Sequence, residues 1–325
     1  MQTAKKTAMT TITLACATDA NYVKPLAALL NSLLHNLPNT TQLKVYILTE
    51  DKNALESHNV LKDIQKNNNI QLIYKTLKLT QADISAIHFG HVTKACLYRL
   101  YLPKLLPNTL EKIVYLDCDI IVNADITELA KLDPKQNHVL VAAEQATDTQ
   151  FVSSPQALPT YKELNIPPQT PFFNTGVMVL NLKLWRKNNI AQKALAYLNK
   201  HANNTRWWDQ DALNVVLLHK WGELNPKWNV QSELFYNLPW NSGVIKTKAM
   251  YKELKNNPAI IHFNTRFKPW HWYSLHPYTF LYRYYAHPNA KHYIVLHKLY
   301  QFAVLHTPLS LVLKLLRKSG KLLRS

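Results

Sequence analysis

The stretch Ile113-Val-Tyr-Leu-Asp117-Cys118-Asp119-Ile-Ile-Val122 places two carboxylates, one residue apart, between two apolar segments. Both segments are short and rich in β-branched side chains, which predicts a buried strand on each side of a turn. Carboxylates at such a position carry a desolvation cost unless a cation neutralises them. A divalent ion such as Mn²⁺ or Mg²⁺ prefers oxygen ligands and shares them with substrate phosphates. The alternative is a turn with two solvated acids, which this motif alone does not exclude.

Apolar strand-like segments alternate with helical segments on both sides of this turn, which predicts an α/β fold with a mainly parallel sheet covered on both faces. The predicted strands are 11–17, 43–49, 70–74, 112–116, 137–143 and 176–180, and the predicted helices are 24–35, 53–67 and 183–201. In such sheets ligands bind beyond the carboxyl ends of the strands. Asp19 and the Asp117/Asp119 pair both follow strands of this kind. Residues 145–169, which include several prolines and serines, are expected to form a long surface excursion.

The composition is that of a globular protein with a full core, since 47% of the 325 residues are hydrophobic. A transmembrane helix is not expected, because no run of 18 uncharged apolar residues occurs. The segment 1–13 is too polar for the apolar stretch of a signal peptide, so we expect a cytoplasmic location. The three cysteines Cys16, Cys96 and Cys118 are scattered among apolar neighbours, which favours reduced core thiols over disulfides.

The net charge indicates an anionic partner. The chain has 38 basic and 20 acidic residues, giving +18, and the segment from Lys255 to Ser325 contains eleven Lys or Arg and no acid. Nucleic acid, phospholipid and phosphorylated substrates are all compatible with this bias. Net charge alone does not choose among them.

An ordered series of short motifs resembles glycosyltransferase family 8, the retaining sugar transferases that include bacterial lipopolysaccharide galactosyl- and glucosyltransferases and glycogenin. The motifs are Ala17-Thr-Asp19-Ala-Asn21-Tyr22, Tyr98-Arg99-Leu100, Tyr115-Leu-Asp117-Cys118-Asp119, Phe173-Asn174-Thr175-Gly176-Val177, Asp209-Gln210-Asp211-Ala-Leu-Asn214 and His262-Phe-Asn-Thr265-Arg-Phe-Lys268-Pro-Trp270. They span residues 12 to about 275. The resemblance implies a GT-A fold, with a Rossmann-like, mainly parallel central sheet flanked by helices. It also implies a UDP-glucose or UDP-galactose donor, Mn²⁺ (or Mg²⁺) as cofactor, and retention of anomeric configuration.

The resemblance assigns the metal ligands to Asp117, Asp119 and His262. A lone histidine after an apolar segment is more often structural, so this role of His262 depends on the resemblance of the downstream motif. A neutral imidazole beside two carboxylates suits Mn²⁺. In the same motif Lys268 is expected to hold the diphosphate as UDP leaves.

Contacts to the substrates are also assigned by resemblance. The expected substrate-binding residues are Ala17, Asp19, Asn21, Tyr22, Cys118, Asn174, Thr175, Asp209, Gln210, Thr265, Lys268 and His91. Asp19 and Asn21 are equally explained as a helix N-cap. Thr265 stands where many relatives have glycine, which leaves the backbone approach to the diphosphate open at this point. His91 matches a position that touches the acceptor in relatives.

Three residues are expected to act in catalysis: Arg99, Asp209 and Gln210. Arg99 resembles the arginine that reaches the donor sugar and neighbouring acids. Asp209 is expected to bind donor hydroxyls, although an acid that begins a helix is also explained by the helix dipole. Gln210 is expected beneath the anomeric carbon, where an amide is a poorer nucleophile than the carboxylate that glycosidases use. We therefore favour front-face attack, with the leaving phosphate oxygen taking the proton of the acceptor.

The C-terminal segment 309–325 predicts an amphipathic helix at an anionic lipid interface. One arc carries Leu309, Leu311, Val312, Leu313, Leu315, Leu316, Leu322 and Leu323, and the other carries Lys314, Arg317, Lys318, Lys321 and Arg324. A helix docked on the core with its basic face in water is the alternative. We divide the chain into a transferase domain, 1–275, and a basic, aromatic, membrane-associating region, 276–325. The expected acceptor is a glycolipid of the lipopolysaccharide core, at the cytoplasmic face of the inner membrane.

Two other classes of function compete with a sugar transferase. A non-catalytic protein that binds nucleic acid would explain the charge of +18, but no nucleic-acid motif occurs and much of the excess lies in the lipid-like tail. A glycoside hydrolase would share the paired carboxylates, but it would not need the uridine-like segment from Asp19 to Tyr22. We therefore expect no nucleic-acid partner.

Overall fold

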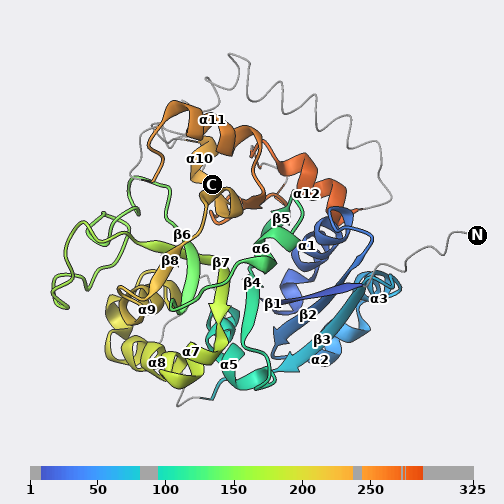
Figure 1. The fold of residues 1–325 in the computed structure, drawn as a ribbon, viewed down its shortest axis with the longest axis horizontal. Helices are drawn as coiled ribbons and strands as arrows, with labels where there is room; N and C mark the ends of the chain where they lie inside the picture. Colours follow the sequence, from blue (N-terminus) through green and yellow to red (C-terminus); the bar gives the residue numbers. More distant parts are fainter. Residues whose placement is uncertain (1–8, 81–93, 237–243, 272–273, 275, 288–325) are drawn as a thin grey trace, which may run out of the picture.

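The computed structural model describes residues 9–80, 94–236, 244–271, 274 and 276–287, and these residues form two sheets with helices around them (Figure 1). The strands are β1 (Thr10–Ala17), β2 (Thr41–Thr49), β3 (Ile70–Thr76), β4 (Lys112–Leu116), β5 (Ile120–Val122), β6 (Val139–Ala143), β7 (Phe173–Asn181), β8 (Trp221–Glu223), β9 (Val230–Gln231) and β10 (Ile260–His262). Each of the six predicted strands is present, with small differences at the ends.

The central sheet has the strand order β3-β2-β1-β4-β7-β6-β8. Strands β3, β2, β1 and β4 pair in parallel, and β8 pairs in parallel with β6. Strand β7 is antiparallel to both of its neighbours, β4 and β6. The prediction of a mainly parallel sheet is therefore confirmed, with β7 as the exception.

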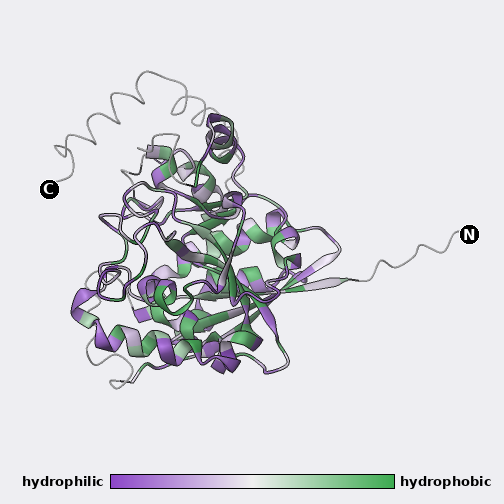
Figure 2. Ribbon diagram, turned by 60° about the vertical axis from the view of Figure 1, so that its left-hand side comes forward, coloured by the Kyte–Doolittle hydropathy of each residue, from purple (hydrophilic) through white to green (hydrophobic). Residues whose placement is uncertain are grey.

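Both faces of the central sheet are covered, because side chains of each strand alternate between two apolar clusters. In β1, Leu14 and Cys16 pack in one cluster and Ala15 packs in the other. The helices of the first face are α1 (Val23–His35), α2 (Lys52–Ser57), α3 (Asn59–Gln65) and α6 (Thr127–Lys131). The helices of the second face are α5 (Leu102–Leu105), α7 (Leu182–Lys187), α8 (Ile190–Lys200) and α9 (Asp209–Val216). Figure 2 shows the hydrophobic colouring concentrated in the central strands.

A second, small sheet has the order β5-β10-β9 and carries the other half of the candidate site. A third apolar cluster joins it to α1, α10 (Glu233–Tyr236), α11 (Lys248–Asn256) and α12 (Thr279–Ala286). Tyr278 and Tyr282 lie in this cluster beside Phe263, and Asn31 of α1 donates a hydrogen bond to the carbonyl of Tyr285 at 2.9 Å. Residues 276–287 thus pack against the domain expected to end at 275.

Two predicted helices are each divided in the structure. The segment 53–67 forms α2 and α3, because His58 has extended backbone angles and its ring accepts from the amide of Val60 to start α3. The segment 183–201 forms α7 and α8, because Asn189 adopts a left-handed conformation with φ 52°. Asparagine tolerates that conformation better than most residues.

The excursion predicted over residues 145–169 is only partly a surface feature. It contains no helix or extended strand, as expected, but Val152, Ala157, Leu158 and Ile166 are buried in the second apolar cluster. The prolines and serines of this segment predict irregular backbone, but they do not show which of its apolar side chains are buried. All three cysteines are free, and Cys16 and Cys118 are buried.

In the part of the chain that the structure describes, we find no helix with the length and hydropathy needed to cross a bilayer. The amphipathic helix predicted over 309–325 and the acceptor-contacting residue His91 lie outside the described residues. Both remain predictions.

Candidate active site

Three segments of the central sheet meet at one edge, and they supply most of the candidate site. Strands β1 and β4 end there, so the residues after Ala17 and Leu116 lie side by side. Strand β7 runs the opposite way, so its first residues, including Asn174 and Thr175, lie at this edge. The amide of Asp117 donates to the carbonyl of Gly176 at 2.8 Å, which holds the acidic turn against the start of β7.

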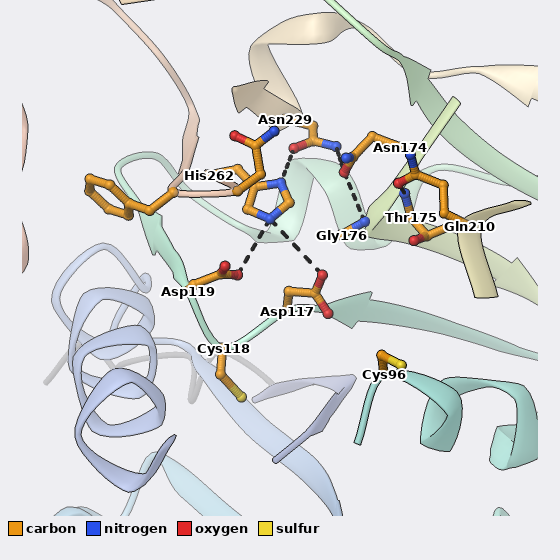
Figure 3. Close-up of polar contacts among 12 residues, drawn as sticks. Cys96, Asp117, Cys118, Asp119, Asn174, Thr175, Gly176, Gln210, Asn229 and His262 are labelled. Atoms are coloured by element: carbon orange, nitrogen blue, oxygen red, sulfur yellow. Dashed lines mark hydrogen bonds and ion pairs between the residues drawn. The ribbon is translucent and has the colours of Figure 1, made fainter. Parts of the chain in front are cut away.

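Asp117, Asp119 and His262 converge at this edge (Figure 3). His262 belongs to β10 and reaches the turn because β10 pairs antiparallel with β5, which follows the turn directly. The Nε2 atom of His262 lies 3.4 Å from Oδ1 of Asp119 and 4.0 Å from Oδ2 of Asp117. One ligand atom from each of the three residues lies within 4.8 Å of the other two.

This trio fits a divalent cation. Two carboxylates and one imidazole form a mixed oxygen and nitrogen ligand set of the kind that Mn²⁺ accepts. Gly176 makes the arrangement possible, because a Cβ added at this residue would lie 2.2 Å from Cε1 of His262. The imidazole therefore lies directly against the backbone of β7.

Arg99 balances the acids on the other side of the turn. It belongs to η2 (Lys94–Tyr101), is 5% exposed, and lies 2.8 Å from Oδ1 of Asp117 and 3.0 Å from Oδ2 of Asp209. Burial raises the pKa of Asp117, and Arg99 opposes that rise. Burial likewise raises the pKa of Asp209, to about 6, against the same guanidinium. Tyr115 completes the contact set by donating to Oδ1 of Asp117 at 2.9 Å.

Lys268 pairs with the second acid of the turn. Its Nζ lies 2.5 Å from Oδ2 of Asp119 and donates to the carbonyl of Phe263 at 2.6 Å. Burial alone would raise the pKa of Asp119, but Lys268 and His262 together hold it well below its usual range. Asp119 is therefore an anion at neutral pH.

Asn174 and Gln210, both predicted to contact the donor, meet at a buried acid that the sequence analysis did not identify. Asn174 Nδ2 donates to Oε1 of Glu144 at 2.9 Å, and Gln210 Nε2 donates to the same oxygen at 3.0 Å. Gln210 Oε1 accepts from the amide of Thr175 at 3.2 Å. Burial, with Glu233 nearby, raises the pKa of Glu144 to about 7.

The segment after β1 has the local structure of a cap. The side chain of Asp19 accepts from the backbone N–H of Asn21 at 2.8 Å. Asp19 is therefore the N-cap of η1 (Ala20–Tyr22), as the capping alternative predicts. Tyr22 packs edge-on against Trp270, with ring centroids 5.4 Å apart. The thiol of Cys118 donates to the carbonyl of Ala17 at 3.3 Å, which joins the acidic turn to this segment. Asn21 is exposed.

Thr265 lies in the loop between His262 and Lys268 and is half-buried. Its Oγ1 is buried and has no hydrogen-bond partner among the described residues. Among the described residues, neither Thr265 nor Asn174 has a side-chain hydrogen bond to another predicted site residue.

Sequence reasoning missed three residues of this site: Tyr115, Glu144 and Asn229. Glu144 follows β6 directly, and the rule that polar residues after strands line the ligand edge could have identified it. Tyr115 lies within the apolar run 113–116, where the sequence pattern predicts a core residue. Asn229 ends η4 (Pro226–Asn229), a short element with no sequence pattern of its own.

An open α/β sheet with a paired-acid turn at its ligand edge, facing a histidine from a second small sheet, is the arrangement expected of a GT-A glycosyltransferase. The family model "Glycosyl transferase family 8" matches residues 13–273, and the chain belongs to that family. The fold shared with the solved glycosyltransferases LgtC and WbbM confirms the GT-A fold implied by the sequence resemblance.

Two curated relatives and two solved structures illustrate the similarity. The chain is 32% identical over 276 residues to general stress protein A of Bacillus subtilis (strain 168), covering 81% of this chain and 88% of that protein. It is 27% identical over 276 residues to lipopolysaccharide 1,2-glucosyltransferase of Escherichia coli (strain K12), covering 82% and 75%. The galactosyltransferase LgtC, solved with donor and acceptor sugar analogs, shares the fold with a TM-score of 0.67 at 20% identity over 85% of this chain and 95% of LgtC. The bifunctional glycosyltransferase WbbM has a TM-score of 0.66 at 20% identity over 88% of this chain, which spans about half (51%) of WbbM.

Proposed function

We propose that this glycosyltransferase moves glucose or galactose from a UDP-sugar, with retention of configuration, onto a saccharide acceptor of the lipopolysaccharide or lipooligosaccharide core. The observation that carries the proposal is the convergence of Asp117, Asp119 and His262 at the ligand edge of the sheet. These residues would hold Mn²⁺ or Mg²⁺, which when bound supplies positive charge for the donor diphosphate.

The donor would lie across the edge between the segment after β1 and the start of α9. Asp19, Asn21 and Tyr22 would contact uridine, with Ala17 and Cys118 beside it. Lys268 would stabilise the negative charge that develops on the diphosphate as UDP leaves. Asn174, Thr175 and Asp209 would contact the donor sugar.

In the proposed reaction, Gln210 lies beneath the sugar as a fixed amide. Hydrogen bonds to Thr175 and Glu144 occupy both ends of this amide, which supports a positioning role over nucleophilic attack. The acceptor oxygen bonds to the anomeric carbon from the side on which the bond to the phosphate oxygen breaks. The acceptor's proton passes to that phosphate oxygen. Arg99 holds Asp209 and Asp117 in place during this exchange.

A donor screen with release of UDP as the readout tests the activity. UDP-glucose or UDP-galactose should give turnover that depends on Mn²⁺ or Mg²⁺. Asp119→Asn should lower the rate roughly a thousandfold, since losing several kcal/mol of charge stabilisation corresponds to about three powers of ten. Turnover by Asp119→Asn at the wild-type rate, or release of free sugar from a plain glycoside without UDP-sugar, would contradict the proposal.

The acceptor and the membrane contact are supported by the basic C-terminal segment and by the similarity to the E. coli lipopolysaccharide glucosyltransferase. We propose that the chain binds the cytoplasmic face of the inner membrane through residues 307–325. Deleting this segment should abolish sedimentation with anionic vesicles and leave hydrolysis of the donor unchanged. Unchanged sedimentation would rule out the role of the tail. Protection of the fold by UDP with Mn²⁺, and not by nucleic acid, would separate this function from nucleic-acid binding.

A further inference from the structure

Asn229 lies directly behind the imidazole of His262 and is fully buried. Its Oδ1 is 2.9 Å from Nδ1 of His262, and its Nδ2 is 2.9 Å from Oδ1 of Asn174 (Figure 3). Asn229 thus bridges a candidate metal ligand and a candidate donor-binding residue. Neither the family motifs nor the strand pattern pointed to it.

The direction of each hydrogen bond in this bridge follows from one backbone group. The amide N–H of Gly176 can only donate, and it donates to Oδ1 of Asn174 at 2.9 Å. Asn174 Oδ1 is therefore an acceptor, so Asn229 must present its NH₂ group to it. The remaining atom of the Asn229 amide, Oδ1, is an acceptor and faces His262.

It follows that Nδ1 of His262 carries the hydrogen and donates it to Asn229. The other ring nitrogen, Nε2, lies on the side of Asp117 and Asp119. In the neutral ring this places the free lone pair of Nε2 among the carboxylates, as metal ligation requires.

We propose that Asn229 is a positioning residue that fixes the tautomer and ring orientation of His262 for binding the divalent cation. This inference rests on the proposed function, because it deepens the account of the same metal site. Gly176 contributes in two ways. Because it has no side chain, the imidazole fits against it, and because its N–H donates to Asn174, it fixes which atoms donate and accept in the chain to His262.

The test compares three variants of the full chain by titration with Mn²⁺ alone. Asn229→Leu removes the acceptor for Nδ1–H, and loss of such a partner costs about 10- to 100-fold in metal affinity. Asn229→Asp keeps an oxygen facing Nδ1–H, but it sets an oxygen against Oδ1 of Asn174 and adds a buried negative charge. Because it retains the acceptor for Nδ1–H, it should bind Mn²⁺ more tightly than Asn229→Leu. Gln231→Met is the matched control: Gln231 is also fully buried, and its side-chain oxygen accepts from the backbone N–H of Gln145 and does not bond the ring of His262.

Pulsed electron paramagnetic resonance of the bound Mn²⁺ supplies a second readout. The wild type and Gln231→Met should show the ¹⁴N coupling of a coordinated imidazole, and Asn229→Leu should lose it. Equal Mn²⁺ affinity in Asn229→Leu and Gln231→Met, with the ¹⁴N coupling retained in both, would overturn the positioning role. If Asp119→Asn then still loses Mn²⁺, only the role of Asn229 fails. If Asp119→Asn binds Mn²⁺ like the wild type, the metal site of the proposed function fails with it.

Discussion

The two sides of the candidate site are built from different chemistry. The ion-pair side consists of Arg99, Asp117, Asp119, Asp209 and Lys268, where each acid lies 2.5 to 3.0 Å from a basic nitrogen. The amide side consists of Asn174, Gln210, Asn229 and Glu144, and the backbone N–H groups of Thr175 and Gly176 set its directions. His262 lies between the two sides and contacts both.

This difference indicates a division of labour. The charges of an ion pair act on other charges over several ångströms, so the ion-pair side is suited to holding a cation and a diphosphate. A buried amide with both ends bonded has one orientation, so the amide side is suited to fixing the sugar and the imidazole. A substitution on the ion-pair side should mainly leave a buried charge without a partner. A substitution on the amide side should mainly change the orientation of the sugar or the imidazole.

The largest effect on stability is expected from Arg99→Met, which leaves Asp117 and Asp209 without their shared buried cation. Removing one partner of a buried ion pair costs about 3–5 kcal/mol. Urea unfolding should show a loss of this size. Arg186→Met is the control, because among the described residues the guanidinium of Arg186 bonds backbone carbonyls, such as those of Pro103 and Leu110, and no acid. Equal losses in the two variants would contradict the electrostatic account of the ion-pair side.

The next effect concerns Asp211, an acid that backbone N–H groups hold without a buried cation. Its Oδ2 accepts from the amides of Arg206 and Trp207 at 2.6 and 3.1 Å, and burial raises its pKa to about 7. In the unfolded chain the carboxyl ionises at about 3.9. Between these values the folded state holds a proton that the unfolded state has lost, so this contribution to stability is lost as pH rises.

Asp211→Asn removes that titration and retains an acceptor for both amides. The stability of the wild type relative to this variant should therefore fall by about 1.4 kcal/mol for each pH unit within that window. Urea unfolding of both proteins at pH 5 and pH 7 measures the difference. A constant difference at the two pH values would show that the backbone amides stabilise the anion as well as water does.

The smallest effect on stability is expected from Gly176→Ala, which changes no charge and alters only the space beside His262. Its added methyl group would displace the ring of His262, and such overpacking typically costs about 1–3 kcal/mol. Mn²⁺ affinity should fall as well, measured by titration. Gly222→Ala on β8 is the control, since its Cβ would approach Asn137 and Leu140 to 2.6 Å without touching the site. That variant should lose stability and keep its Mn²⁺ affinity.

The parts of the molecule that could be predicted from sequence are those governed by local pattern. Strand β4 is predicted with the observed bounds because four apolar residues follow Lys112 and the polar turn ends the strand. The placement of Asp117 at a ligand edge follows from the same pattern. The breaks at His58 and Asn189 were missed, because one extended or left-handed residue leaves the helical periodicity almost unchanged.

The remainder depends on contacts between distant segments. His262 was assigned by resemblance alone, since nothing local shows that β10 pairs with β5. Asn229 reaches His262 across 33 positions of sequence. No pattern in a single sequence reports which buried amide meets which imidazole. Strand β7 was predicted without a direction, and its antiparallel direction is seen only in its pairing with β4 and β6.

That reversed direction makes the site sensitive to register. Residues of β4 pair with residues of β7 in one register, from Lys112 with Asn181 to Leu116 with Val177. A one-residue insertion or deletion within β7 would turn Asn174 to the face now occupied by Thr175, since neighbouring strand residues point to opposite faces. The sheet could still form, but Gly176 would no longer lie against the ring of His262. The hydrogen bond from the N–H of Gly176 to Oδ1 of Asn174 would also be lost. Length changes should therefore be tolerated in the loops around the site far better than within this strand.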